Sequence, residues 1–391
     1  MRIGLIVPGG VDRSAQVRVM PMLLALIERL ARRHEVLVVA INQEPEACEF
    51  SLLDARVVNL GSLPEHRIIN WPIRLRRLLS ALKSFGGSFD VLHAFWAHPP
   101  GSLAIAAGAL IGVPVVVSIG GGELEWLPEI GYGGQGTLRS RTMTSTTLRR
   151  ATIVSAPSAY ALQPLRKLRK DALWLPMGVA GRFFQTVTAD TDDSSRRLLH
   201  VGSLNWVKDQ TTLMHAMRLV SDVRPDVRLD CIGVDTLGGR IQRLACDLGI
   251  SNAVRFHGVL PVDELLPFYR RAHVFVQSSR HESMGAAVLE AAAAGVPIVG
   301  TSVGLVAEMS PQAAVAVPVG DAEALAHGIV TLLADEEQRA RVGREAQRFA
   351  RTYDADWTAL QLEAIYEKVT STGTPRPTDP SLESHRISAG Q

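Results

Sequence analysis

Short apolar runs alternate with amphipathic segments from the start of the chain. Residues 2–7 are a continuous apolar run, which is typical of a buried parallel strand. Residues 16–33 follow with helical spacing, and 35–41 form a second apolar run. Strand, helix and strand in this order predict parallel pairing. The apolar face of the expected helix consists of Met20, Leu23, Leu24, Ile27 and Leu30.

The same alternation recurs to about residue 318 and predicts an α/β protein. Further strands are expected at 56–60, 90–95, 113–119, 152–156, 173–176, 197–202, 227–233, 254–258 and 273–277. A chain of 391 residues is too long for one ordinary core and suits two domains. We therefore expect two doubly wound, Rossmann-like domains.

The amino-acid composition is that of a globular protein. A hydrophobic fraction of 47% with 20% charged residues excludes a disordered chain. Cys48, Cys231 and Cys246 are widely spaced and show no metal pattern, so we expect three small core residues in a reducing cytoplasm.

Neither a leader nor a membrane span is expected. Met1-Arg2 leads directly into a strand, without the basic and apolar regions of a signal peptide. The longest apolar run, residues 102–119, is interrupted by Gly108, Gly112 and Pro114 and divides into a helix and a strand. These features predict a cytoplasmic protein.

Charge is unevenly distributed along the chain. Residues 1–180 hold 20 Lys and Arg against 13 Asp and Glu, or +7, whereas the remainder holds 21 against 26, or −5. The first half is thus expected to meet something anionic. Residues 64–83 fit either an ordinary surface helix or a basic amphipathic helix in peripheral contact with an anionic membrane. No nucleic-acid partner is expected.

The candidate chemistry lies in residues 278–308. Glu282 stands in the loop after a buried strand, and a helix is expected from about Gly285 until Gly295 and Pro297 end it. Glu290 lies eight residues after Glu282, about 12 Å along a helix. The small residues at the helix start allow an anion to approach the backbone amides at the positive end of the helix.

Each carboxylate also has an ordinary structural interpretation. Glu282 alone fits a helix cap, and Glu290 alone fits a solvated helix position. However, Leu289 and Ala291 flank Glu290 in an otherwise apolar helix, and a buried carboxylate needs a partner.

The sequence of this segment resembles the donor-site signature of the family 4 glycosyltransferases, which are retaining GT-B enzymes. The match consists of Glu282, Glu290 and the following run of alanines, Gly295 and Pro297. By this resemblance, Glu282 lies against the donor sugar, Glu290 binds the ribose, and the helix start holds the diphosphate. The helix start comprises Gly285, Ala286 and Ala287, and Ser283 and Met284 before it are also expected in the donor site.

The resemblance assigns further donor-site positions. Gly9 and Gly10 follow the first strand and either approach the diphosphate or simply turn the chain. The loop of Ser203 and Lys208 resembles the family's phosphate-binding loop, with Ser203 where an Arg is usual. The corner Gly258, Val259 and Leu260 corresponds to main-chain contacts with the nucleotide base.

The first half departs from the family pattern at one position. Gly120 stands where the family carries a histidine beside the reacting sugar. We expect the amides of Gly120, Gly121 and Gly122 to supply oxyanion-hole hydrogen bonds, and Glu123 to contact sugar or acceptor hydroxyls. The predicted catalytic side chains are Glu282, Lys208 and Glu123. His98 and Tyr132 complete the expected acceptor side.

The resemblance also implies the domain boundaries. We expect an acceptor-binding domain at 1–177, a nucleotide-sugar domain at 178–352 and a helix at 353–370 that crosses back to the first domain. The polar linker 186–195 and a disordered tail at 371–391 complete the chain. The buried face of the crossing helix is expected to hold Trp357, Leu360, Ala364 and Tyr366.

Together these features predict a retaining hexosyltransferase of GT-B fold that uses a nucleoside-diphosphate sugar and an unidentified acceptor. Neither a cofactor nor an obligatory metal is expected, because no Asp-x-Asp triplet follows a strand. A dinucleotide-dependent oxidoreductase is disfavoured, since residues 8–11 and 202–205 lack the Gly-x-Gly-x-x-Gly pattern. A catalytically silent sugar-nucleotide binder or partner subunit remains the alternative, given Gly120 and Ser203.

Overall fold

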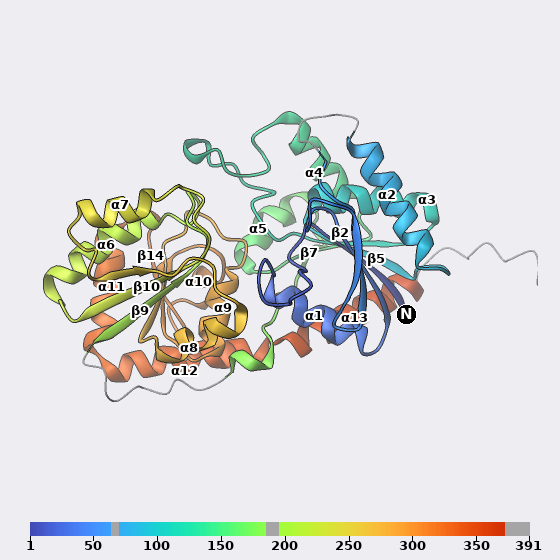
Figure 1. Ribbon diagram of the computed structural model, residues 1–391. Helices are drawn as coiled ribbons and strands as arrows, with labels where there is room; N and C mark the ends of the chain where they lie inside the picture. The colour runs from blue at the N-terminus through green and yellow to red at the C-terminus, as the bar shows by residue number, and fades with distance from the viewer. Residues whose placement is uncertain (64–69, 185–194, 372–391) are drawn as a thin grey trace, which may run out of the picture.

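The computed structural model describes residues 1–63, 70–184 and 195–371. It contains two α/β domains side by side, each built on one twisted, mainly parallel sheet (Figure 1). Helices cover both faces of each sheet, so each strand is buried on two sides. The predicted fold class, a GT-B arrangement of two Rossmann-like domains, is confirmed.

The first domain has an eight-stranded sheet in the order β3-β4-β2-β1-β5-β6-β7-β8. Its strands are β1 Arg2–Val7, β2 Glu35–Ala40, β3 Cys48–Leu52, β4 Ala55–Asn59, β5 Val91–Phe95, β6 Val115–Ser118, β7 Ile153–Ala156 and β8 Leu173–Trp174. Its α-helices are α1 Pro21–Ala31, α2 Asn70–Ser84, α3 Ser102–Ile111, α4 Leu138–Arg150 and α5 Ala159–Leu168.

The second domain has a six-stranded parallel sheet in the order β11-β10-β9-β12-β13-β14. Its strands are β9 Arg196–Val201, β10 Val227–Ile232, β11 Val254–Phe256, β12 Val274–Gln277, β13 Ile298–Thr301 and β14 Val315–Val317. Its helices are α6 Gln210–Val223, α7 Arg240–Asp247, α8 Val262–Arg271, α9 Ala286–Ala293, α10 Gly304–Met309, α11 Ala322–Ala334 and α12 Glu336–Thr352.

Two elements of the first domain differ from the expectation. β3 pairs antiparallel with β4 at the sheet edge, and its alternating burial lacks the continuous apolar run of the other strands. Helix α1 begins at Pro21 and not at residue 16 as expected. Residues 15 and 18 have positive φ, which a right-handed helix does not accommodate. Cys231 is buried as expected, but Cys246 is exposed, so not every cysteine is a core residue.

Helix α13, Ala355–Ser371, crosses from the second domain and packs on α1 of the first (Figure 1). Tyr366 is fully buried, and its hydroxyl lies 2.6 Å from Nδ1 of the buried His93. The prediction for Leu360 and Ala364 is wrong, since both are exposed. The buried stripe follows a different set of helical positions, namely Ala355, Thr358, Ala359, Leu362, Tyr366 and Val369.

Some expectations fall outside the described chain. The linker 186–195 lies there except for its last residue, and so does the tail 371–391 beyond residue 371. The basic segment 64–83 is described from Asn70 onward, as α2. Of its arginines, Arg77 donates to the carbonyl of Leu60 at 2.5 Å, which ties this side chain to the fold. Across the described ranges, no helix is long and apolar enough to cross a membrane.

Candidate donor site in the interdomain cleft

The loops after β9 and β12 bring together the two charged groups that the sequence analysis selected. The Nζ atom of Lys208 lies 2.5 Å from Oε1 of Glu282. Ser279 Oγ donates to the same carboxylate oxygen at 2.6 Å. Both loops leave the carboxyl edge of a parallel sheet, where open α/β folds bind their ligands. A half-buried ion pair at this edge is therefore a candidate binding centre.

Neighbouring hydrogen bonds hold the two loops together. Ser278 Oγ donates to the carbonyl of Lys208 at 2.9 Å, and Thr301 Oγ1 donates to the carbonyl of Ser279 at 2.6 Å. Arg280 reaches Asp209, the N-cap of α6, at 3.2 Å. The position of Glu282 is thus determined by residues from three strand ends.

Helix α9 begins beside this pair, as predicted. Gly285 is its N-cap residue with φ of 94°, a conformation that side-chain-bearing residues rarely adopt. Its first amides have no earlier helical carbonyl to bind, so this end is a candidate anion site, as the sequence analysis predicts. Gln277 at the end of β12 lies close to Gly285, and its buried Nε2 has no hydrogen-bond partner in the described chain. Sequence reasoning missed this donor.

Glu290 lies inside α9 and is only 4% exposed, so the interpretation as a solvated helix residue is wrong. The hydroxyl of Tyr269 on α8 donates to its Oε2 at 2.7 Å. Burial raises the pKa of Glu290 to about 7. The partner that a buried carboxylate requires is thus Tyr269, while the role in binding ribose stays a prediction.

Glu123 behaves differently from the expectation. Its buried carboxylate accepts hydrogen bonds from the backbone amides of Ala97 and Gly120 at 3.2 Å each and of Gly121 at 2.6 Å. Burial raises the pKa of Glu123, and these amides lower it. The Gly120 and Gly121 amides are occupied by Glu123 and do not face an oxyanion. Glu123 therefore positions the glycine loop, and its predicted contact with hydroxyls stays a prediction.

The loop after β1, which contains Gly9 and Gly10, is a turn. Gly10 has φ of 81°, and Oε1 of Gln43 accepts from the amides of Gly10 and Val11 at 2.7 and 3.0 Å. Of the two interpretations left open for Gly9 and Gly10, the turn explains Gly10 without a ligand.

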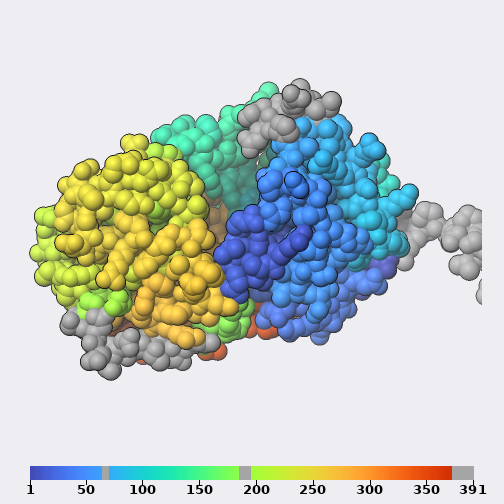
Figure 2. Space-filling model, viewed as in Figure 1, coloured from blue at the N-terminus to red at the C-terminus, as the bar shows by residue number. Residues whose placement is uncertain are grey.

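Hydrogen bonds cross between the domains at the start of α9. Ser283 Oγ donates to the carbonyl of Gly121, and Ser158 Oγ donates to the carbonyl of Ser283 at 2.5 Å. The loop before α1 also meets the second domain, where Gln16 Nε2 donates to Asp263 at 2.9 Å. Figure 2 shows this dark blue segment against the orange part of the second domain. These hydrogen bonds join the two domains beside the start of α9.

His281, next to Glu282, lies between two rings of the first domain. Its ring centroid is 5.9 Å from that of Tyr132 and 5.8 Å from that of Tyr160. His281 is 5% exposed, and burial lowers its pKa. Sequence reasoning selected Tyr132 but missed His281, Ser158 and Tyr160, because their contacts join segments more than a hundred residues apart.

The other predicted acceptor-side residue, His98, is half-buried in the short turn Ala97–Gly101 that precedes α3. Its Nδ1 lies 3.0 Å from Oγ of Ser102. Burial lowers the pKa of His98, and the nearby charges of Arg139 and Arg74 lower it further. His98 therefore belongs to a cationic part of the first domain.

The remaining donor-side positions lie along the same edge of the second sheet. The Ser203 carbonyl accepts from Gln210 Nε2 at 3.0 Å, and the Gly258 carbonyl accepts from the Gly233 amide at 2.8 Å. Val259 is 54% exposed, whereas Leu260 packs against the core of the second domain. Their predicted contacts with diphosphate and base stay predictions. Among the described residues, no three His, Cys, Asp or Glu side chains gather as metal ligands.

Two family models match the chain and together span most of it. Residues 19–172 match "Glycosyl transferase 4-like domain", and residues 185–349 match "Glycosyl transferases group 1". Relatives include proteins named D-inositol 3-phosphate glycosyltransferase from Corynebacterium efficiens, 31% identical over 191 residues, and from Corynebacterium urealyticum, 34% identical over 190 residues. These alignments cover 46% and 45% of this chain and 45% and 44% of the relatives. The chain thus matches less than half of each relative's length.

Solved structures resemble the whole fold. A sucrose-phosphate synthase from Thermosynechococcus elongatus superposes with a TM-score of 0.79 at 19% identity, covering 95% of this chain and all of the other. Anabaena HepE in complex with UDP and glucose superposes with a TM-score of 0.75 at 16% identity, covering 94% and 100%. With its two parallel-sheet domains and the acid pair flanking the start of α9, the chain belongs to the family 4 glycosyltransferases of GT-B fold.

Proposed function

We propose that this protein transfers a hexosyl group, with retention of configuration, from a nucleoside-diphosphate sugar to an acceptor hydroxyl. The observation that carries the proposal is the Lys208–Glu282 pair at 2.5 Å beside the amino end of α9. A cation, unpaired helix amides and a carboxylate are thus within one small region. This set suits a ligand that joins a diphosphate to a hydroxyl-rich sugar.

In this proposal each residue of the site has a separate role in the transfer. Lys208 and the first amides of α9 stabilise the negative charge that develops on the departing nucleoside diphosphate. Glu282 accepts hydrogen bonds from hydroxyls of the donor sugar, and Glu290 accepts from the ribose. The bond between the anomeric carbon and the diphosphate oxygen breaks, and the acceptor oxygen bonds to that carbon from the same face. The acceptor proton passes to the departing diphosphate, so no metal or separate base is required.

Replacing Lys208 tests this proposal. We expect Lys208→Ala to lower the transfer rate by about 10²–10³, the range for losing one group that stabilises transition-state charge. Donor hydrolysis and transfer are measured with UDP-, GDP- and ADP-sugars. Lys170→Ala, on the exposed surface of the first domain, serves as the matched control. An unchanged donor affinity and rate in Lys208→Ala would rule out the phosphate role.

The alternative is a sugar-nucleotide binder without activity. It is favoured by Gly120, which replaces the family's histidine, and by Ser203, which replaces an arginine. A thermal shift with nucleoside diphosphates but no turnover of any donor and acceptor would support this alternative. Measurable hydrolysis of one sugar nucleotide would exclude it.

For the acceptor, we propose an anionic molecule such as a phosphorylated polyol. Residues 1–180 carry a formal charge of +7, and Arg74 and Arg139 lie near His98 on the expected acceptor side. The relatives named D-inositol 3-phosphate glycosyltransferase have a phosphorylated polyol in their names. We expect Arg139→Gln to raise the KM for inositol phosphate and to leave the use of unphosphorylated inositol unchanged. Equal effects on both acceptors would contradict an anionic acceptor.

A further inference from the structure

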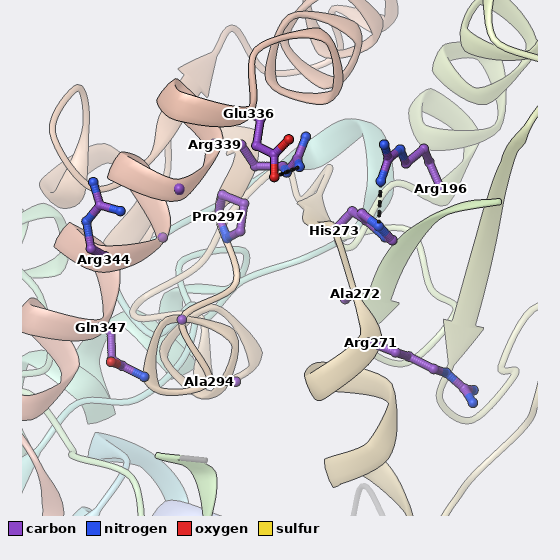
Figure 3. A pocket seen from close by; sticks show the side chains of 13 residues that line it. Arg196, Arg271, Ala272, His273, Ala294, Pro297, Glu336, Arg339, Arg344 and Gln347 are labelled. Carbon is purple, nitrogen blue, oxygen red and sulfur yellow. Dashed lines mark hydrogen bonds and ion pairs between the residues drawn. The ribbon is translucent and has the colours of Figure 1, made fainter. Parts of the chain in front are cut away.

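A cavity of about 370 Å³ opens at the amino edge of the second sheet, the edge opposite Lys208 and Glu282. Its walls are the starts of β9, β12 and β13 on one side and α12 on the other (Figure 3). A strand of six residues spans roughly 20 Å, so the cavity and the candidate donor site are well separated. The volume lies within the range of about 300–1,000 Å³ that is usual for small-molecule sites.

Arginine dominates the charge of this cavity. Four of its lining side chains are guanidinium groups and one is a carboxylate, which gives a formal charge of +3 (4 − 1). The arginines are Arg196, Arg271, Arg339 and Arg344, and the carboxylate belongs to Glu336.

Arg339 is largely buried, and its charge is poorly compensated. Its side chain is 13% exposed, whereas Glu336, its ion-pair partner among the described residues, is 88% exposed and 3.9 Å away. A pair of this kind contributes little. The Nη1 atom of Arg339 reaches the carbonyls of Leu332 and Leu333 only at 3.4 Å each. Burial lowers the pKa of Arg339, and the charge of Arg196 lowers it further.

Contacts within the protein explain the positions of only some of these four arginines. Arg271 ends α8, and its guanidinium stacks 4.1 Å from the ring centroid of Phe268, pointing away from the other side chains in Figure 3. Arg339 lies near the last carbonyls of α11. Arg344, by contrast, makes no ion pair or hydrogen bond with the described residues. Arg196 Nη1 lies 3.2 Å from a ring nitrogen of His273, a contact that leaves its positive charge in place.

We propose that this cavity, which we call the arginine cavity, is a second anion site that binds a small phosphate-bearing molecule. Guanidinium groups match phosphate oxygens with paired hydrogen bonds. An anion beside Arg196 and Arg339 relieves the repulsion between these two charges, and Arg344 lines the same cavity. The ligand approaches from solvent, since Arg344 is exposed. The site does not depend on the proposed sugar transfer.

Calorimetric titration of the full chain with inorganic pyrophosphate tests the proposal, because two separate sites are then expected. Arg339→Gln/Arg344→Gln should weaken binding at one site by about tenfold or more, the effect of losing charge-assisted hydrogen bonds. Lys208→Ala should leave that site intact and weaken the other. Arg348→Gln, whose side chain is 74% exposed on the same helix and is paired with Glu345, is the matched control.

The outcomes separate this inference from the proposed function. Identical titrations for wild type, Arg339→Gln/Arg344→Gln and Arg348→Gln would overturn the arginine cavity as a phosphate site. Binding that is lost only in Lys208→Ala would also overturn it while supporting the donor site. Arg344→Gln alone gives a second variant with an exposed change, so a folding defect of the Arg339 substitution does not obscure the result. Unfolding curves confirm that each variant is folded.

Discussion

Replacing the buried acid Glu290 with glutamine should change how the stability of this protein depends on pH. Burial raises the pKa of Glu290 from 4.5 to about 7. Between these values the unfolded chain has lost the proton that the folded protein still holds. The free energy of unfolding therefore falls as pH rises from about 4.5 through about 7, and it levels off by about pH 8.

The magnitude follows from the shift. A difference of about 2.5 pKa units (7 − 4.5) at about 1.4 kcal/mol per unit corresponds to about 3 kcal/mol. Glutamine has no proton to lose and can still accept the hydrogen bond from Tyr269. Relative to wild type, Glu290→Gln should thus gain about 3 kcal/mol of stability between pH 4.5 and about pH 8.

Urea unfolding at four pH values across this window measures the effect. Glu323→Gln, an exposed substitution in the first turn of α11, controls for the loss of one carboxylate and should show no such trend. If the curves of wild type and Glu290→Gln remain parallel, Glu290 does not hold its proton in the folded protein and the reasoning fails.

The same group links pH to nucleotide binding. If ribose hydroxyls bind the ionised carboxylate, affinity for a nucleoside diphosphate should rise up to about tenfold per pH unit below pH 7 in wild type. Glu290→Gln should lose this dependence. An equal pH dependence in both proteins would remove Glu290 from the ribose site.

Two substitutions test the packing, and a third variant tests the membrane contact. A Cβ at Gly178 would lie 2.0 Å from the carbonyl carbon of Asp354, so Gly178→Ala should cost at least about 1–3 kcal/mol in thermal unfolding; an unchanged Tm would contradict this packing of α13. Tyr366→Phe removes the hydroxyl at His93 and should lower the free energy of unfolding by about 1–3 kcal/mol, as measured by urea unfolding. An unchanged free energy of unfolding would contradict this contribution. If α2 is an ordinary surface helix, co-sedimentation with anionic vesicles should be equal for wild type and a variant with alanine at Arg74, Arg76 and Arg77, and a clear decrease would support the membrane contact.

Local spacing determined much of the fold and the core of the donor site. Strand, loop and helix succeed one another within residues 273–293, so the order of Glu282, Gly285 and Glu290 along the chain places them at one edge of the sheet. The crossing helix was recognised from its resemblance, but its buried face was misjudged at Leu360 and Ala364, because helical periodicity in a mixed sequence fits more than one face.

Tertiary structure alone decided what each polar group binds. Glu123 has the residue type for hydroxyl recognition, yet the fold places three backbone amides around it. Tyr269 is an unremarkable helix residue until α8 packs on α9 and brings its hydroxyl to Glu290. The contact of Ser158 with Ser283 spans 125 residues of sequence. Sequence patterns record the period of burial along one element, whereas a hydrogen bond between distant elements depends on how they pack in three dimensions.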